Sequence, residues 1–353
     1  MAPSRVRKEV DAALHAFVDR QRPMLSTLGD DLAPMVTALD ALLAGGKRLR
    51  PAFCYWGWRG SGGGDCPEIF AAAASLELLQ ASALIHDDVM DGSDTRRGQP
   101  SAHRRFEALH AASGWRGSAE AFGAGAAILL GDVCLTWSDE MFQGSGLPED
   151  ALRRGRPVFD IMRTEVMCGQ YLDLVGQARG CGVDPRAMVE AALQVVRFKA
   201  AKYTIERPLQ LGAALAGSGE MAALSAYGMP LGIAFQLRDD VLGVFGDPAE
   251  TGKPAGDDLR EGKRTVLIAL TLERSAPAQA ETVERLLGDP GLDADGVERL
   301  RAIIVDTGAL DACERMIDRY ADEASGALTS APLTAEARAA LSDLTIAATA
   351  RRV

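Results

Sequence analysis

The feature that most constrains the fold is a long apolar segment, residues 67–91, that ends in three aspartates. Its sequence AAAASLELLQASALIHDD is apolar nearly all round a helix, and Pro67 stands near its start. A helix that is apolar on every side belongs in a protein interior. The segment therefore predicts a long buried helix whose last turn delivers Asp87, Asp88 and Asp91.

Helical periodicity recurs along the 353 residues, and strand signals are nearly absent. We expect breaks or kinks at Pro208 and Pro230, and a mobile lid over the charged, Gly/Pro-rich segment 246–262. The pattern predicts an all-α protein with one domain over 1–353, a motif-bearing core at 45–265 and C-terminal helices at 266–353. The predicted helices span 4–21, 28–44, 67–91, 100–112, 118–142, 186–204, 219–244, 262–275, 279–288, 294–306 and 308–353, the last with a break near Pro332. Two more are predicted, one that the basic patch at 45–51 opens and that runs to about Trp58, and one that follows the turn at 143–150 and ends near 171–175.

Composition excludes several classes of protein. There are 38 basic against 49 acidic residues, a formal charge of −11, which argues against a nucleic-acid partner. Six cysteines form no CxxC pair and there are only four histidines, so we expect reduced thiols and no zinc site. No run approaches about 18 uninterrupted apolar residues and the N-terminus lacks a signal-peptide core, so we expect a cytoplasmic protein without a transmembrane helix.

The three aspartates have a chemical use. Positions i and i+4 share a helix face, so Asp87 and Asp91 project side by side with Asp88 flanking them. Hard carboxylate oxygens in this arrangement suit Mg²⁺. Arg96 and Arg97 follow closely, and their fork-shaped donors suit phosphate oxygens. For the aspartates alone, a solvated acidic helix end is an equally good interpretation.

Two further stretches favour the diphosphate interpretation. Residues 235–265 read FQLRDDVLGVFGDPAETGKPAGDDLREGKRT, in which an apolar helix again delivers paired aspartates, Asp239 and Asp240, and charged residues follow. Residues 45–51 read GGKRLRP, a basic patch that opens a helix. Two acidic helix ends and three basic patches suggest two anionic substrates held around metal.

These motifs resemble those of the trans-isoprenyl diphosphate synthases, or polyprenyl synthetases. GGKRLRP, then DDxxD with TRRG behind it, then FQxxDD…TGK…GDD…GK stand in the family's order and spacing from about Gly45 to Thr265. The resemblance implies a bundle of antiparallel helices around a deep central cavity, and usually a homodimer. It implies a Mg²⁺-dependent enzyme that joins isopentenyl diphosphate head to tail with an allylic diphosphate (dimethylallyl, geranyl or farnesyl) by ionisation, condensation and proton loss.

The resemblance also implies a role for each matching residue. Asp87 and Asp91 should ligate Mg²⁺ with Asp88 in support, and Asp239 should hold a further ion, three in all with substrate bound. Asp258 and Lys263 should help to close the lid. The allylic diphosphate should be gripped by Arg96, Lys199 and Lys253 and lined by Gln236 and Asp240, and isopentenyl diphosphate should be bound by Lys47, Arg50, Gln80 and Arg97, with Lys263 also among the substrate-binding residues. The predicted catalytic residues are Asp87, Asp91, Arg96, Lys199, Asp239 and Lys253.

Two positions depart from the family's pattern. Gly243 replaces the third aspartate of the second acidic motif, which alters a metal contact or a metal-bound water. Ala200 follows Lys199 where the family usually has threonine, which removes a hydroxyl near the allylic substrate. We expect both departures to leave the enzyme active.

Product length depends on the residues below Asp87, because the chain grows along that helix. The fourth and fifth residues before Asp87 are Ala83 and Ser82, both small, and Leu79 lies a turn further on. One helical turn is about 5.4 Å, comparable to one isoprene unit. Leu79 as the floor predicts a twenty-carbon product, geranylgeranyl diphosphate. A longer polyprenyl product is the alternative, because facing residues such as Cys134 to Trp137 also contribute to the floor.

Other functions fit the sequence less well. Farnesyl synthases often carry an aromatic residue where Ser82 or Ala83 stands. A terpene cyclase normally pairs DDxxD with an Asn/Asp-Ser/Thr-Glu motif, which is missing near Asp239, and it needs no isopentenyl diphosphate site. A non-catalytic modulatory subunit would be expected to lose aspartates, whereas only position 243 departs.

Overall fold

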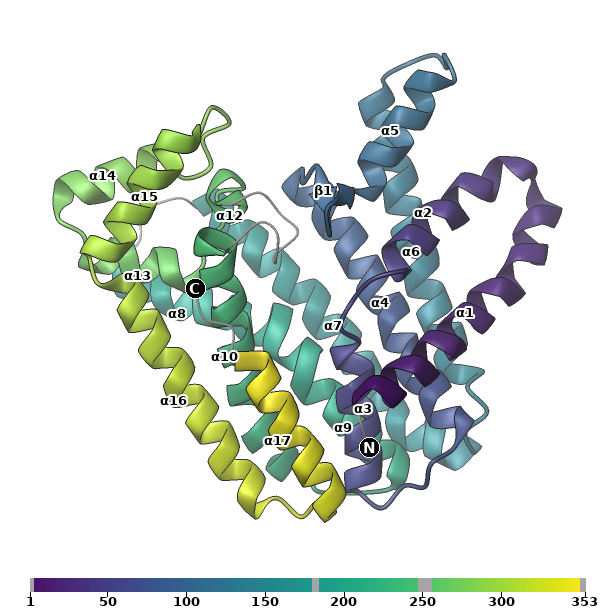
Figure 1. Ribbon diagram of the computed structural model, residues 1–353. Coiled ribbons are helices and arrows are strands. Elements are labelled where there is room, and N and C mark those ends of the chain that lie inside the picture. Colours follow the sequence, from purple (N-terminus) through teal and green to yellow (C-terminus); the bar gives the residue numbers. More distant parts are fainter. Residues whose placement is uncertain (1–2, 180–183, 247–255, 350–353) are drawn as a thin grey trace. The chain divides into compact units, whose positions relative to one another are not determined.

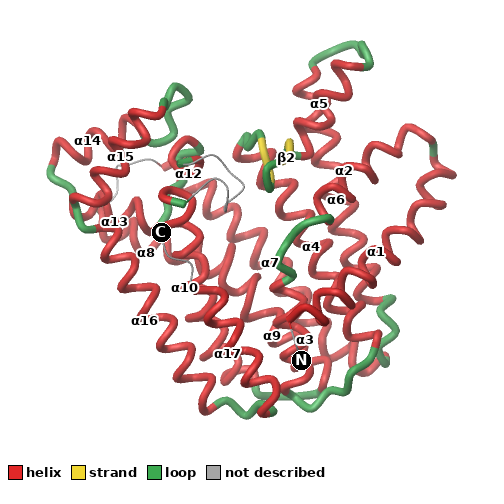
Figure 2. The backbone as a smooth tube through the Cα atoms, viewed as in Figure 1, coloured by secondary structure: helices red, strands yellow, loops and turns green. Residues whose placement is uncertain are grey.

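The computed structural model describes residues 3–179, 184–246 and 256–349, and nearly all of these are helical (Figures 1 and 2). The strands among them are two dipeptides, β1 (Thr95–Arg96) and β2 (Gln99–Pro100). They pair antiparallel, with Thr95 opposite Pro100 and Arg96 opposite Gln99. The all-α prediction is confirmed.

The chain forms two compact units, each assembled from segments that are far apart in sequence. The first comprises Met1–Phe159, Pro208–Gly219 and Leu333–Ala340. The second comprises Asp160–Arg207, Glu220–Pro332 and Leu341–Val353. A single domain over 1–353 stays a prediction.

Helix α4 (Pro67–Asp91) is the central helix of the first unit. It packs most extensively on α6 and also on α1 and α3 (Figure 1). Leu76 and Ile85 lie on opposite sides of α4 and are at most 1% exposed, so the helix is buried on both sides, as predicted; towards its C-terminal end Ala83 and Asp87 are half-buried. The other elements of this unit are α1 (Pro3–Leu28), η1 (Asp30–Leu32), α2 (Ala33–Leu43), α3 (Leu49–Gly60), α5 (Ala102–Ala112), α6 (Ala119–Gln143), the first part of α7 (Glu149–Arg179), most of α9 (Arg207–Ala216) and the first part of α17 (Ala335–Thr349).

The sequence sets both ends of α4. Pro67 occupies the first turn, where its missing N–H costs no helical hydrogen bond. Gly92 ends the helix in the left-handed conformation, with φ 66° and its N–H donated to Asp88 O. The predicted bounds 67–91 are therefore confirmed, and the three aspartates fall in the last two turns.

In the second unit, α10 (Met221–Phe245) packs on α16 (Ala309–Ser330) and on the π-helix η2 (Val196–Glu206). Its apolar face joins a core that includes Val241, Leu267, Leu300 and Ile317, each at most 1% exposed. The remaining elements are the second part of α7, α8 (Pro185–Val195), α12 (Asp257–Arg260), α13 (Val266–Arg274), α14 (Pro277–Leu286), α15 (Ala294–Asp306) and the second part of α17.

Some predicted boundaries were wrong. The single helix expected over 186–204 is α8 followed by η2, in which the backbone pairing lengthens to the i→i+5 pattern. Pro208 lies in the first turn of α9, next to the change from η2 to α9, and Pro230 lies inside α10, which continues past it; kinks at these two prolines stay predictions. The helix expected over 4–21 continues to Leu28, whereas the break near Pro332 is confirmed between α16 and α17.

Two described helices, α4 and α6, are long and apolar enough to cross a membrane by length and composition alone. In α4, 72% of the qualifying window is buried inside the protein, as is common in the core helix of a soluble protein; in α6 the share is 28%. The prediction of no transmembrane helix rested on uninterrupted apolar runs and stays a prediction.

Candidate active site

The first acidic motif lies at the C-terminal end of α4, where the helix dipole disfavours carboxylates. Asp87 and Asp91 are one turn apart on the same face, as predicted. The side chain of Asp87 is 15% exposed, whereas that of Asp88 is 3% exposed and lies on another face. The carboxylates at this helix end therefore need cations on two sides, one beside Asp87 and Asp91 and one beside Asp88.

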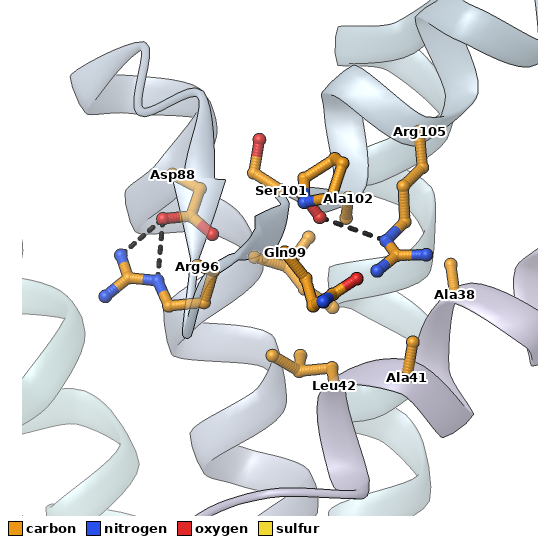
Figure 3. A pocket seen from close by; sticks show the side chains of 11 residues that line it. Ala38, Ala41, Leu42, Asp88, Arg96, Gln99, Ser101, Ala102 and Arg105 are labelled. Carbon is orange, nitrogen blue, oxygen red and sulfur yellow. Dashed lines mark hydrogen bonds and ion pairs between the residues drawn. The ribbon is translucent and has the colours of Figure 1, made fainter. Parts of the chain in front are cut away.

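Arg96 supplies one of these charges. The β1–β2 hairpin returns it to α4, where its Nε donates to Asp88 Oδ1 at 2.9 Å and its Nη2 donates to the same oxygen (Figure 3). The same Nη2 lies 3.6 Å from Asp87 Oδ2. Arg105 of α5 anchors the hairpin by donating from Nε to Pro100 O at 3.0 Å (Figure 3). Arg96 is thus held between two of the three aspartates.

Arg97 points elsewhere because of the hairpin turn. Arg97 and Gly98 are its two central residues and have φ of 54° and 71°, the positive values that a type I′ turn requires. The side chain of Arg97 donates from Nη1 to Leu42 O, at the end of α2, at 2.7 Å. The two adjacent arginines, which form one basic patch in the sequence, therefore bind at different places: Arg96 at Asp88 of α4, and Arg97 at the end of α2.

Arg97 is surrounded by other charges of the first unit. Burial lowers its pKa; the carboxylate of Glu77 opposes this shift, and the cations Arg48, Arg96 and Arg50 add to it. Arg97 thus lies near three other arginines, of which Arg96 pairs with Asp88 and Arg48 pairs with Glu77. A region of this kind is suited to an anionic ligand.

The basic patch at residues 45–51 leads into α3. Lys47 is exposed, and half-buried Arg50 lies in the first turn of this helix. The N–H groups at a helix N-terminus attract anions, and the two cations strengthen that field. Half-buried Gln80 lies on α4, two turns before Asp87. Their role in binding isopentenyl diphosphate stays a prediction.

The two small residues before Asp87 lie on different sides of α4. Ala83 is half-buried and shares the face of Asp87, one turn away, whereas Ser82 is 3% exposed. Ser82 precedes His86 by one turn, and a Cβ on Gly131 of α6 would lie 2.2 Å from His86 Nε2, so this side of α4 lies against α6. Leu79, the predicted floor, is 1% exposed.

The second acidic motif belongs to α10. Asp240 is 5% exposed and accepts a hydrogen bond from Gln236 Nε2 at 2.8 Å. Burial raises the pKa of Asp240 well above its usual value; the bond from Gln236 opposes this shift, and the charges of Asp258 and Asp239 add to it. A cation beside these carboxylates would favour the ionised form of Asp240.

The structure explains why glycine stands at position 243. A Cβ there would lie 1.9 Å from Asp258 Oδ2 and 2.6 Å from its Cγ. The carboxylate of Asp258, which α12 contributes, thus occupies the space beside Gly243 where the side chain of the missing aspartate would begin. The second motif therefore keeps a third carboxylate, supplied from 15 residues further along the chain.

Lys199 and Lys202 on the π-helix have acidic partners that the sequence reasoning missed. Lys199 Nζ lies 2.6 Å from Asp173 Oδ2, and Lys202 Nζ lies 2.7 Å from Glu165 Oε1. A signal for Asp173 was present, because it is the one charged residue in the stretch 166–178. Lys202 is thereby placed in a structural ion cluster together with Arg207, which also bonds to Glu165.

Lys263 contacts Glu261 Oε2 and lies 3.6 Å from Asp258 Oδ1. Of the predicted lid at 246–262, residues 247–255 with Lys253 lie outside the described residues, whereas α12 (Asp257–Arg260) forms part of the rest. The roles predicted for these residues stay predictions.

The aspartates present fit a magnesium ion that the substrate helps to bind. Within residues 3–179, 184–246 and 256–349, no group of three or more His, Cys, Asp or Glu side chains forms a complete metal site. Mg²⁺ is often bound by one or two carboxylates together with substrate phosphates and water. Asp87 and Asp91 on one helix face provide such a pair.

Comparison with known proteins agrees with the motifs. The family model described as polyprenyl synthetase matches residues 33–304. A geranylfarnesyl diphosphate synthase of Aeropyrum pernix is 34% identical, covering 84% of this chain and 86% of its own. A geranylgeranyl diphosphate synthase of Mycobacterium tuberculosis is 31% identical, covering 93% and 88%.

A solved structure is also similar. The crystal structure of geranylgeranyl pyrophosphate synthase from Corynebacterium glutamicum, complexed with isoprenyl diphosphate and magnesium, is 42% identical over 100% of both chains, with a TM-score of 0.95. The family match over most of the chain and this agreement in fold lead to one conclusion. The chain belongs to the polyprenyl synthetase family and is a trans-prenyltransferase.

Proposed function

We propose that this prenyltransferase makes geranylgeranyl diphosphate by adding isopentenyl diphosphate to dimethylallyl, geranyl and farnesyl diphosphates. The observation that carries the proposal is on α4, where small, half-buried Ala83 lies one turn from Asp87 and buried Leu79 lies one turn beyond it. A small residue in the first turn below Asp87 leaves room for about one more isoprene unit than a fifteen-carbon product has, and Leu79 in the next turn would stop further growth. Relatives named geranylgeranyl diphosphate synthase support this choice.

We propose Asp87, Asp91 and Asp239 as the residues that would hold Mg²⁺, with Asp88 in support and three ions when substrate is bound. When bound, the metal would stabilise the charge that develops on the leaving diphosphate. The magnesium complex of the Corynebacterium glutamicum neighbour supports magnesium as the ion.

The chain's own residues bind and orient two diphosphates. Arg96 and Lys199 would bind the allylic diphosphate, with Lys253, Gln236 and Asp240 in the same role; each within its own unit of the fold, Arg96 is held at Asp88 and Lys199 at Asp173. Lys47, Arg50, Gln80 and Arg97 orient isopentenyl diphosphate. The allylic C–O bond then breaks, the isopentenyl double bond attacks the cation, and a proton is lost. Apolar walls and closure by Asp258 and Lys263 exclude water, which would otherwise quench the cation.

A longer product is the second candidate. The relative from Aeropyrum pernix is named a geranylfarnesyl diphosphate synthase, and its product would be one unit longer. Ser82 gives this candidate a structural basis. Its small side chain lies on the side of α4 that faces α6, so residues of α6 also help to set how far the product chain can grow.

The test is incubation of the purified protein with labelled isopentenyl diphosphate, each allylic primer and Mg²⁺, followed by chromatography of the dephosphorylated products. A twenty-carbon alcohol is expected. A product of twenty-five or more carbons would favour the second candidate, a cyclic hydrocarbon would indicate a cyclase, and no reaction would indicate a modulatory subunit.

We also propose a homodimer and a cytoplasmic location. On α6, the side chains of Phe122, Ile128 and Leu129 are 37%, 45% and 61% exposed, and a second copy of the chain would cover them. Free thiols at the five described cysteines fit a reducing compartment. Light scattering coupled to size exclusion would measure the oligomer.

A further inference from the structure

Arg48 is a buried arginine to which neither the motifs nor the proposed function give a role. It is 5% exposed, although it lies between Lys47 and Leu49 at the start of α3. Its backbone has φ 53° and ψ 38°, the left-handed conformation that side-chain-bearing residues rarely adopt. Such a conformation persists only where the surroundings impose it, so the contacts of Arg48 matter.

Three acceptors from three helices hold this guanidinium. Nη1 donates to Glu77 Oε2 of α4 at 2.7 Å, and Nε donates to Asp11 Oδ1 of α1 at 2.7 Å. Nη2 donates to Leu43 O at the end of α2. The side chains of Arg48 and Glu77 are 4% and 5% exposed, so this pair is buried, whereas Asp11 is 30% exposed. Arg48 is the only cation that the structure's described residues record in an ion pair with Glu77.

Arg97 lies beside this pair. A Cβ on Gly46, whose φ is 116°, would lie 3.1 Å from Arg97 Nη2 and 3.2 Å from Arg48 Nη1. The two guanidinium groups are thus neighbours over the backbone of Gly46, whose positive φ favours glycine. Because the carboxylate of Glu77 acts on Arg97 electrostatically, Arg97 is the cation placed to replace Arg48 beside it.

We propose that Arg48 is a positioning residue of the isopentenyl diphosphate site: it neutralises Glu77, and so keeps Arg97 directed at the diphosphate instead of at this buried carboxylate. The inference rests on the proposed function, because that function assigns Arg97 to isopentenyl diphosphate. A buried carboxylate that loses its partner attracts another cation strongly, since its charge is poorly solvated. Arg48 would therefore affect substrate binding without touching substrate.

The experiment measures equilibrium binding of isopentenyl diphosphate by calorimetry and the KM values of both substrates in four proteins: wild type, Arg48→Met, Arg48→Met/Glu77→Gln, and Arg59→Met as the control. In Arg48→Met, we expect isopentenyl diphosphate to bind about ten- to a hundredfold more weakly, as loss of one charge-assisted bond implies. The KM for farnesyl diphosphate should stay within about twofold, a change worth under 1 kcal/mol.

The double variant separates the electrostatic role from a merely structural one. With glutamine at 77 no unpaired carboxylate competes for Arg97, and binding should return to within about threefold of wild type, a difference under 1 kcal/mol. If Arg48→Met is insoluble, the double variant is compared with wild type directly and the same recovery is expected. Binding of the double variant as weak as that of Arg48→Met, or more than tenfold below wild type, would overturn the proposal.

Arg59→Met is a matched control because Arg59 lies at the other end of α3 and also forms an ion pair, 2.9 Å from Glu336. We expect it to lower stability and leave isopentenyl diphosphate binding unchanged; weakening equal to that in Arg48→Met would refute a specific role for Arg48. Failure of the proposed function would be distinct, since the wild type itself would then neither extend a primer nor bind isopentenyl diphosphate.

Discussion

Restoring the third aspartate of the second acidic motif should harm this protein. From the sequence, Gly243→Asp returns the residue that the family pattern expects and should improve metal binding. The structure predicts the opposite, because the carboxylate of Asp258 already lies beside Gly243, with Oδ2 only 1.9 Å from where a Cβ would be. We therefore expect Gly243→Asp to lower both stability and activity.

The magnitude follows from what must move. Carbon atoms in contact normally lie about 3.5–4.0 Å apart, so Asp258 must shift. The backbone of Asp258 is held, because Lys263 N donates to Asp258 O at 3.0 Å, so the shift falls on the carboxylate, which would move relative to Lys263 Nζ, now 3.6 Å from Oδ1. Overpacking of this kind costs about 1–3 kcal/mol. Replacing a helical glycine by alanine returns about 1 kcal/mol, so Gly243→Ala should lose about 0–2 kcal/mol in unfolding free energy.

Gly243→Asp adds a charge to this steric cost. Two like charges about 4 Å apart repel by up to about 4 kcal/mol at an effective dielectric constant of 20. Gly243→Ala carries only the steric part, so the difference between the two variants isolates the repulsion. Because a divalent cation offsets repulsion between carboxylates, Mg²⁺ should narrow that difference and leave the deficit of Gly243→Ala unchanged.

Denaturant unfolding with and without Mg²⁺, together with the Mg²⁺ dependence of chain extension, would test this reasoning. Wild type, Gly243→Ala and Gly243→Asp are compared under the same conditions. A Gly243→Asp protein as stable as wild type and active at lower Mg²⁺ would show that the space beside position 243 is open, and the argument from Asp258 would be wrong.

Three further predictions concern other residues. Asp88→Asn should cost about 1–3 kcal/mol, because it removes the buried carboxylate that holds half-buried Arg96 and leaves Asp87 beside it, and should raise the KM for the allylic substrate; urea unfolding and steady-state kinetics measure both. Ala83→Phe and Ser82→Phe should each shift the product to fifteen carbons or fewer, but only Ser82→Phe should also cost about 1–3 kcal/mol, because it pushes on α6; unchanged products in both would remove α4 as the ruler. Burial would raise the pKa of Glu165, but hydrogen bonds from two cations hold it below the usual 4.5. A lowered pKa in the folded state stabilises above pH 4.5 and loses its effect as pH falls further, so the stability gap between wild type and Glu165→Gln should be widest near neutrality and shrink in acid.

Much of the fold was predictable from residues close together in the chain. The bounds of α4 follow from Pro67 and Gly92, which act within one turn of the two helix ends, and the apolar stretch between them predicts the helix itself. The extent of η2 was not predictable, because α-helix and π-helix place apolar residues at similar spacings and the choice between them depends on packing against α10. The family and the order of its motifs were likewise accessible from sequence.

The sequence by itself determined which charged residues stand at the helix ends. The apolar helix, the signal that ends it and the acidic residues before that signal are all close together in the chain. Only the tertiary structure decided how those charges are paired. Asp88 faces Arg96, Glu77 is neutralised by Arg48, and Asp258 fills the space beside Gly243, and each pair joins segments that no local pattern connects. A carboxylate's role depends on its burial and on the cation nearest to it, and both are properties of the folded chain.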